Sequence, residues 1–468
     1  MGLIFYDTET TGTKTFFDQI LQFAAIRTDE ALNEIDRFEI RCRLLPYVVP
    51  APGAVRVNGV NVSHLTDPTL PSHYEMVRTI RATLLSWSPA VFIGWNSIHF
   101  DEELVRQALY KTLHSPYLTN CNGNSRSDAM RVAQACSVFV PGSLTLPTGE
   151  DGREVFKLDQ IAPANGFKCE RAHDAMSDVE ATVFICRLLA ERAPDIWSCF
   201  MRFSTKAAVV SYITEERVFC LCDFFFGQPF SWIVTTIGQN QDNRAEWYVY
   251  NLSVDPESLL ALSDAQLAAR LDESPKPLRR LKSNAAPMIF PPEDAPDICK
   301  GRELGLEELE HRAAVLQANP ALRERLISVF DSLKEEYPAS PHVEEQIYDA
   351  FIEEIDEKLM DAFHEAEWPQ RLAIVERFQD PRLRTIGRQL IHLERPDLFD
   401  KAICREHRMA AAKRLLGLGE GISWLTLPEA LHEIEAMLLV ASGAELKLLQ
   451  EHRQYLRERH EQALVDAK

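Results

Sequence analysis

The chain has 468 residues, of which 46% are hydrophobic and 26% are charged, and its net charge at pH 7 is −20. This length predicts about three domains, and the acidic total excludes a general polyanion binder, so a nucleic-acid site needs a local basic lining. The sequence contains no apolar run long enough to predict a membrane span and no pattern of a secretory signal peptide. Its ten cysteines include no CxxC pair, which is typical of buried thiols in a reducing compartment. We therefore expect a cytoplasmic protein without a membrane segment.

Short apolar runs alternate with helical patterns in residues 1–192. The segments "LIFYD", "LQFAAIRTD" and "RFEIRCRLL" predict strands, and "YEMVRTIRATLLSW" has helical spacing. A further buried strand, "AVFIGWN", leads into the helix "DEELVRQALYKTL", and "DAMSDVEATVFICRLLAER" has apolar residues along one helical face. This order predicts an α/β domain with a mixed sheet over residues 1–192.

The pattern changes twice after residue 192. The segments "AVVSYI", "VFCLCDFFF", "SWIVTTIG" and "EWYVYNL" predict short strands of a small antiparallel barrel or sheet with helical connectors, over residues 197–338. The segment "EEYPASPH" (335–342) is the best candidate for a linker. Residues 341–468 are almost entirely helical in pattern. The most acidic stretch, with a net charge of −11 over residues 301–400, has no predicted role.

The first strand ends on two carboxylates, Asp7 and Glu9. Residues two apart in a strand project from the same face, so these two like charges lie side by side and repel each other unless a cation neutralises them. The alternative is a strand-end turn, in which Asp7 and Thr8 cap backbone groups and Gly12 supplies the bend. On this motif alone, the turn is the stronger interpretation.

Acidic residues also begin two predicted helices. Asp101 follows "VFIGWNSIHF", and for this residue alone an ordinary helix N-cap is the stronger interpretation. In "AHDAMSD" (172–178), Asp174 is a candidate N-cap and Asp178 falls on the first turns of the helix. His173 precedes this helix beside carboxylates, where a histidine can take a proton from water; a surface histidine is an equal alternative.

Taken together, these residues predict a catalytic metal site. Asp7, Glu9, Asp101 and Asp178 supply hard oxygen ligands, which select Mg²⁺ or Mn²⁺ over zinc, and His173 supplies a base. Two such ions held by carboxylates are suited to in-line attack on a phosphodiester.

The three motifs "DTETTG", "FIGWNSIHFDEE" and "AHDAMSD" resemble, in order and separation, those of the DEDD-type 3′→5′ exonucleases, histidine variant. The segments "QFAAIRTD", "PGAVRVNGV", "NSRSDAMRV" and "EEQIYDAFIEE" are similar to the bacterial exonuclease I family. This resemblance covers essentially the whole chain and is weakest in the middle region. It implies a ribonuclease H-like nuclease domain, an SH3-like domain and a helical C-terminal domain. The implied activity is degradation of single-stranded DNA from the 3′ end to 5′-mononucleotides, in DNA repair or recombination.

The resemblance also implies roles for individual residues. Asp7, Glu9 and Asp178 are expected to ligate two Mg²⁺ ions, for which Mn²⁺ can substitute. Asp101 is expected to hold the second ion through water, and His173 is the expected general base. The residues that the resemblance implies as substrate contacts are Glu9, Arg106, Phe156 and Lys157.

Some positions depart from the family pattern. Lys157 stands where an arginine is usual, which keeps the charge but loses the bidentate geometry. Gln134 replaces an expected arginine, and "NAAP" (284–287) lacks an expected lysine, so two DNA contacts expected outside the active site have no matching residue here.

A single-strand path needs basic residues and aromatic faces. The densest basic run, "KPLRRLK", supplies four candidates, which are Lys276, Arg279, Arg280 and Lys282. A solvated charge run is an equally weighted interpretation. Trp232, Trp247 and Tyr250 are candidate stacking residues, although aromatic residues in strands are more often core.

Three expectations concern substrate and partners. An RNA-trimming exonuclease is the alternative within the same fold, since the catalytic residues barely separate the two substrates. A non-catalytic scaffold is the alternative from another class, but all five catalytic residues are present. The resemblance further implies binding of the acidic tail of the single-stranded-DNA-binding protein, and we expect a monomer.

Overall fold

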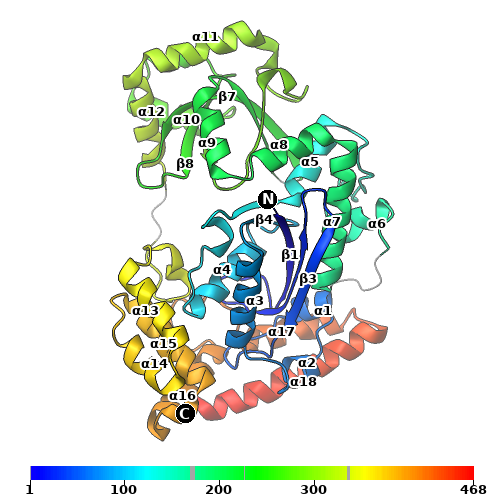
Figure 1. Ribbon diagram of the computed structural model, residues 1–468, viewed down its shortest axis with the longest axis vertical. Helices are drawn as coiled ribbons and strands as arrows, with labels where there is room; N and C mark the ends of the chain where they lie inside the picture. The colour runs from blue at the N-terminus through cyan, green and yellow to red at the C-terminus, as the bar shows by residue number, and fades with distance from the viewer. Residues whose placement is uncertain (1, 169–173, 226, 335–337) are drawn as a thin grey trace.

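The computed structural model describes residues 2–168, 174–225, 227–334 and 338–468. It confirms the expected fold class, since an α/β region is followed by a β-rich region and then by a helical region (Figure 1). The boundaries of three independent domains stay a prediction. Within the described residues, no helix is long and apolar enough to cross a membrane.

The α/β region is built on a mixed sheet of strand order β3-β2-β1-β4-β5. The central strand β1 is antiparallel to β2 and parallel to β4, and β5 continues the parallel part. The elements of this region are β1 (Gly2–Thr10), β2 (Ile20–Thr28), β3 (Glu34–Arg41), α1 (Pro52–Asn58), α2 (Val62–Leu65), α3 (His73–Trp87), β4 (Ala90–Gly94), α4 (Asp101–Lys111), β5 (Ser125–Asp128), α5 (Ala129–Phe139), α6 (Leu158–Ala164) and α7 (Ala175–Arg192).

Alternation along β1 divides the core between the two faces of the sheet. Leu3 and Phe5 belong to the cluster that includes residues of α5 and α7, whereas Ile4 and Tyr6 belong to the cluster that includes residues of α3 and α4. The face of β1 that carries Leu3 and Phe5 therefore continues through Asp7 and Glu9 toward α7, with which β1 is in contact. The side chain of Thr8 points instead toward α4.

The β-rich region contains an antiparallel sheet of order β10-β6-β7-β8-β9. This arrangement is consistent with the expected small antiparallel sheet. The elements are α8 (Pro194–Arg202), α9 (Lys206–Glu215), β6 (Phe219–Phe225), β7 (Gln228–Gln239), β8 (Glu246–Asn251), α10 (Asp264–Asp272), β9 (Leu278–Lys282), β10 (Met288–Phe290), α11 (Gly305–Ala318) and α12 (Pro320–Ser332).

One predicted strand of this region is wrong. The segment "AVVSYI" lies in α9, where Val209, Tyr212 and Ile213 are buried and follow helical spacing. Thr205 caps this helix by accepting the N–H of Ala208. The β-branched composition suggested a strand, but the three- and four-residue spacing of the buried side chains matches a helix that covers the sheet.

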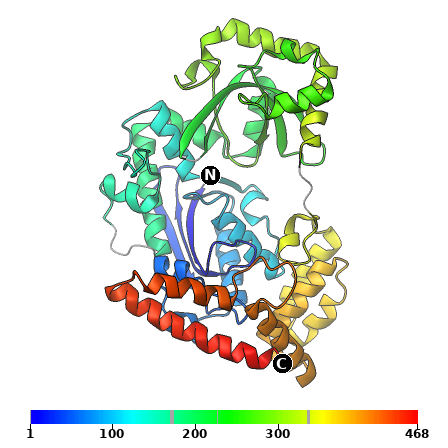
Figure 2. The ribbon, with the colours of Figure 1, turned by 180° about the vertical axis from the view of Figure 1, so that it is seen from behind.

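The C-terminal region is helical, as expected, and it packs on the α/β region. Helices α13 to α15 share a core with Tyr74, Tyr110 and Leu113, and α18 contacts α1 and α2. Figure 2 shows α17 and α18 lying across the α/β region at the end opposite to the β-rich region. The elements are α13 (Glu354–Glu365), α14 (Trp368–Val375), α15 (Pro381–Glu394), α16 (Lys401–Leu416), α17 (Leu427–Leu438) and α18 (Gly443–Asp466).

Candidate active site

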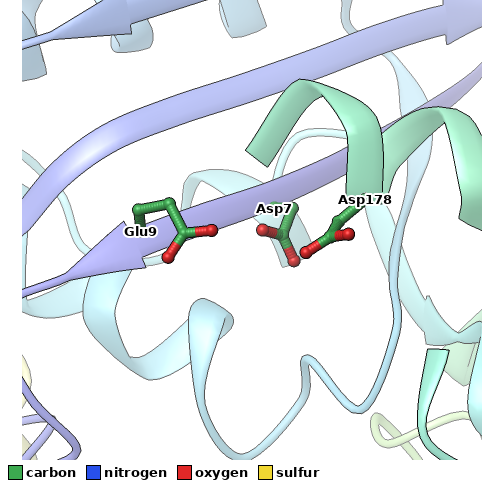
Figure 3. Close-up of side chains that lie close together, drawn as sticks. All are labelled: Asp7, Glu9 and Asp178. Carbon is green, nitrogen blue, oxygen red and sulfur yellow. The ribbon is translucent and has the colours of Figure 1, made fainter. Parts of the chain in front are cut away.

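Three of the predicted acids meet at the end of β1. Each of Asp7, Glu9 and Asp178 offers a carboxylate oxygen, and these oxygens lie within 4.8 Å of one another. Asp7 and Glu9 come from one face of β1, and Asp178 comes from the first turns of α7 opposite that face (Figure 3). The apolar residues before Asp7 are buried on both sides of the sheet, so the strand holds the first two carboxylates in fixed positions.

The electrostatics of this cluster favour a bound cation. Burial, and then the carboxylates of Asp101, Asp178 and Glu9, raise the pKa of Asp7 well above its usual value. Burial, followed by Asp178, Asp101 and Asp174, raises the pKa of Glu9 to about 8, which Arg41 only partly opposes. Hence the cluster holds excess negative charge that a divalent ion would neutralise, and its all-oxygen donor set fits such an ion.

Asp101 belongs to α4, which packs on the face of the sheet opposite to Asp7 and Glu9. It is the first residue of α4, it is buried, and its Oδ1 accepts hydrogen bonds from Thr8 N (3.1 Å) and Thr8 Oγ1 (2.5 Å). Burial raises its pKa to about 7, against the effect of the bonds from Thr8. The N-cap interpretation is wrong, because Phe100 occupies that position and no side-chain cap bond is present there. Alternation in β1 therefore brings Thr8 to Asp101 while it brings Asp7 to Asp178.

The start of α7 differs in part from expectation. Asp174 is the N-cap residue, as predicted, but its side chain makes no cap hydrogen bond. Its Oδ2 instead accepts from Arg41 (2.8 Å) and Gln22 (3.3 Å), which attach the helix start to the sheet. His173 lies outside the described residues, so its expected role as a base stays a prediction.

A buried carboxylate that the sequence reasoning missed lies beside Asp101. Glu102 is fully buried and accepts hydrogen bonds from Tyr6 Oη (3.1 Å), Arg106 Nε (3.0 Å), Arg126 Nη1 (3.1 Å) and Thr119 Oγ1. Burial acts to raise the pKa of Glu102, but the two arginines hold it below its usual value. The only sequence signal was the repeated acid in "FDEE", which is equally typical of a solvated helix start.

The hydrogen bonds around Glu102 also fix the side chain of Arg106. This arginine was expected to contact substrate, but its side chain is buried, pairs with Glu102 and contacts Tyr348 at the start of the helical region. Asp128 is a second missed residue, and its Oδ1 accepts the N–H of Asn96 at 2.9 Å. This bond fixes the turn between β4 and Asp101.

Phe156 and Lys157 precede α6, and Phe156 contacts the β-rich region. Phe156 is buried, its carbonyl oxygen accepts from Trp95 Nε1 at 2.9 Å, and its ring contacts that of Phe224 in the β-rich region at 5.9 Å. Lys157 is exposed at the start of α6.

The residues of the predicted basic run have different surroundings. Lys276 pairs with Asp272 at 2.8 Å, and Arg280 pairs with Asp331 at 2.8 Å and Glu246 at 3.3 Å. Arg279 lies over the ring of Trp232, with 3.5 Å between its guanidinium carbon and the ring centroid. Of the other stacking candidates, Tyr250 is fully buried in the core that the β-rich region shares with the α/β region, and Trp247 packs against a separate core cluster that includes Trp232.

A cavity of about 200 Å³ lies between the α/β region and the β-rich region and is lined by residues of both. Its polar lining combines basic residues from both regions with His99, which is two residues before Asp101. Gln134 also lines it, at the position where an arginine was expected. The basic lining residues are Arg131, Arg280 and Lys282.

The chain is similar in sequence and in structure to known exonucleases. The sequence model of the family RNase_T, described as exonuclease, matches residues 4–186. Exodeoxyribonuclease I of Escherichia coli (strain K12) is 29% identical over 405 residues, which cover 82% of this chain and 83% of that protein. Exonuclease I from Methylocaldum szegediense has a similar structure, with a TM-score of 0.84 and 23% identity over 98% of this chain and 99% of that chain. E. coli Exonuclease I in complex with a dA16 oligonucleotide matches with a TM-score of 0.83 at the same identity and coverage.

Proposed function

Since this chain is a homologue of exodeoxyribonuclease I with an exonuclease domain at residues 4–186, we propose that it degrades single-stranded DNA from the 3′ end to 5′-mononucleotides. The observation that carries the proposal is the set of three carboxylates within 4.8 Å at the end of β1 and the start of α7. The similarity over most of the chain supports DNA as the substrate, because the complex of the E. coli protein holds a DNA oligonucleotide.

The catalytic roles follow from the surroundings of each acid. Asp7, Glu9 and Asp178 would hold two divalent cations, which we propose are Mg²⁺. When bound, these ions would supply the positive charge that stabilises the attacking and leaving oxygens of the phosphodiester. Asp101, oriented by the two bonds from Thr8, would help to hold the second ion. His173 takes the proton of the attacking water while the water oxygen bonds to phosphorus and the bond from phosphorus to the 3′-oxygen of the preceding nucleotide breaks. That 3′-oxygen takes up a proton from solvent, and the 3′-terminal nucleotide leaves with its 5′-phosphate.

The path of the strand is proposed along the boundary between the α/β region and the β-rich region. The cavity there has three basic lining residues and reaches His99, beside Asp101. Lys157, at the start of α6, contributes a contact to a phosphate of the strand. Phe156 supports the path through the contact between its ring and that of Phe224. Arg106 supports the wall of the path from inside the protein, through its buried ion pair with Glu102.

Further parts of the proposal concern organisation and partners. The division into domains at 1–192, 197–338 and 341–468 is supported by the two separate sheets and the helical C-terminal region. Binding of the single-stranded-DNA-binding protein and a role in DNA repair are supported by the resemblance alone. A cytoplasmic location is supported by the cysteine pattern, and a monomeric state is our expectation.

The proposal is tested with end-labelled oligonucleotides of matched DNA and RNA sequence, single-stranded and double-stranded, with Mg²⁺ and with EDTA. We expect 5′-mononucleotides from the 3′ end of single-stranded DNA, only with the metal. Asp7→Asn is expected to abolish product formation, and Asp361→Asn, on the exposed side of α13, is the matched control that keeps it. Faster degradation of RNA would refute the substrate, and full activity of Asp7→Asn would refute the site.

A further inference from the structure

The start of α7 is fastened to the sheet one helical turn before Asp178. Asp174 is the N-cap residue of α7, and its carbonyl oxygen accepts the N–H of Asp178 at 3.1 Å. Its carboxylate makes no bond to the helix backbone, and its Oδ2 instead accepts from Arg41 Nη2 at 2.8 Å and from Gln22 Nε2 at 3.3 Å. Residues four apart lie on the same face of a helix. Asp174 therefore faces the sheet beside Asp178, and a movement of one carries the other with it.

The register of the sheet places this attachment beside the clustered acids. Glu9 on β1 is paired with Gln22 on β2, and Gln22 is paired with Arg41 on β3. Directly paired residues of neighbouring strands project from the same face. A carboxylate, an amide and a guanidinium thus form one row across three strands, next to the start of α7. The row has a member of the acid cluster at one end and the partner of Asp174 at the other.

The attachment is largely shielded from water. Gln22 is 1% exposed, and the side chains of Asp174 and Arg41 are 12% and 31% exposed. Glu39, on the same strand as Arg41, accepts from Gln22 Nε2 at 2.8 Å and from Arg41 Nε at 3.4 Å. Both donors are therefore held between two carboxylates. A guanidinium fixed in this way positions its partner more rigidly than an exposed ion pair does.

A second ion pair joins the same two elements and provides an internal comparison. Arg37, four residues earlier on β3, pairs with Glu180 of α7 at 2.8 Å, and these side chains are 48% and 41% exposed. Arg37 also pairs with Glu34 of its own strand at 2.7 Å. Exposed pairs of this kind contribute about 0–1 kcal/mol and hold geometry weakly. Of the two pairs, the one at Arg41 is the better shielded and is attached one turn before a member of the acid cluster.

We propose that Arg41 is a positioning residue for the reaction. It acts through Asp174 to hold the carboxylate of Asp178 at the distance from Asp7 and Glu9 that divalent cations require. Gln22 supports the same carboxylate of Asp174 from the buried side. The inference rests on the proposed function, because it takes the three clustered acids to be the ligands of the catalytic metal ions.

Two physical effects of Arg41 on metal binding have opposite signs. As a positive charge near the acids, Arg41 disfavours a cation there, so its removal would tighten metal binding. As a clamp on Asp174, it keeps the ligands together, so its removal would weaken metal binding; loss of a residue that orients metal ligands typically costs about 10–100-fold in affinity or activity. We expect the second effect to be larger, because Glu39 and Asp174 already neutralise the charge of Arg41.

The test measures Mn²⁺ binding to the full chain by isothermal titration calorimetry without DNA, and mononucleotide release from oligo(dT) over a range of Mg²⁺ concentrations. Arg41→Met keeps the length of the side chain but removes its charge and its hydrogen bonds. We expect its Mn²⁺ affinity, and its rate at limiting Mg²⁺, to fall about tenfold or more. Excess Mg²⁺ should restore part of the rate, and the KM for DNA should stay unchanged. Arg41→Lys, which keeps the charge without the fork, should be intermediate, and Arg37→Met is the matched control that binds Mn²⁺ as the wild type does.

A double-mutant cycle shows whether Arg41 acts through Asp174. Asp174→Asn keeps the shape of the side chain and removes the ion pair. In Arg41→Met/Asp174→Asn the two effects should not add, because each change removes the same contact. Thermal denaturation in EDTA should place Arg41→Met within about 4 °C of the wild type. If this variant does not fold, the reduced Mn²⁺ affinity of Arg41→Lys provides the same comparison.

Three results overturn the inference. Tighter Mn²⁺ binding by Arg41→Met would show that Arg41 acts only as a charge. Unchanged Mn²⁺ binding with a raised KM for DNA would show that it contacts the strand directly, and additive effects in the double variant would show that it does not act through Asp174. Failure of the proposed function is seen separately, as absence of mononucleotide release by the wild type in Mg²⁺, whereas the Mn²⁺ titrations do not depend on cleavage.

Discussion

Replacing Asp7 with asparagine tests the electrostatic account of the active site, because the change removes one like charge and keeps the shape. Its carboxylate lies within 4.8 Å of those of Glu9 and Asp178. At that separation and an effective dielectric constant of about 20, each pair of full charges repels by roughly 3.5 kcal/mol. Partial protonation and solvent exposure reduce this repulsion, so we expect Asp7→Asn to stabilise the metal-free protein by about 1 kcal/mol.

The effect has a defined pH dependence. Burial and neighbouring carboxylates raise the pKa of Asp7, and raise that of Glu9 to about 8, above the values of the unfolded chain. Folding therefore favours the protonated forms, and this contribution to stability is present below about pH 4 and is lost as the pH rises toward 8. The stability advantage of Asp7→Asn should accordingly grow between pH 5 and pH 8.5.

Thermal denaturation in EDTA measures how much the variant stabilises the metal-free protein, and denaturation in Mg²⁺ measures how much metal-binding energy the variant loses. In EDTA at pH 8.5 the variant should unfold about 2–4 °C above the wild type, the shift typical of 1 kcal/mol in a domain of this size. Saturating Mg²⁺ should reverse the order, because only the wild type gains metal-binding energy, by about 2.7 kcal/mol at a hundred times the dissociation constant. Asp361→Asn should shift neither value. A variant that is less stable than the wild type in EDTA would refute the repulsion.

Three further changes test other parts of the structure. Glu102→Ala leaves Arg106 and Arg126 buried without their carboxylate, so urea denaturation should show a loss of about 3–5 kcal/mol; a loss below 1 kcal/mol would contradict the network. Burial lowers the pKa of His114 to about 2 and that of the stacked His364 to about 4, so both rings fold neutral and stability should fall as the pH drops from about 6.5 to 4. His114→Phe should reduce this fall, and an unchanged pH profile would contradict it. Gly94→Ala would bring a Cβ to 2.5 Å from that of Ser97, so the turn before Asp101 must shift. We expect kcat to fall about tenfold or more. A normal kcat would show that the turn adapts to the added Cβ.

Local patterns in the sequence predicted the strand and the helix that hold the three clustered acids. The apolar run before Asp7 predicts a buried strand, and the two-residue period of a strand places Asp7 and Glu9 on one face. The helical spacing after Asp178 likewise predicts α7. These are local relations between residues close in the chain, which is why sequence patterns contain them.

Long-range relations were decided only by the tertiary structure. Asp101 taken alone predicts an N-cap, and only the sheet brings Thr8 to its carboxylate; Arg106 is expected to contact substrate, and only the fold buries it against Glu102. The segment of α9 shows the same limit, since its β-branched residues favour a strand and its packing on the sheet makes it a helix.

The contact between Arg279 and Trp232 also depends on pairing between strands. The sequence identifies these two residues separately as candidates for the strand path, but it does not indicate that the guanidinium lies over the ring. The sequence thus determined which groups could bind a cation, because carboxylates two residues apart in a strand project from one face and repel each other. Only the fold decided which acids lie close enough to share a cation and which arginines pair with carboxylates, because both depend on distances between residues far apart in the chain.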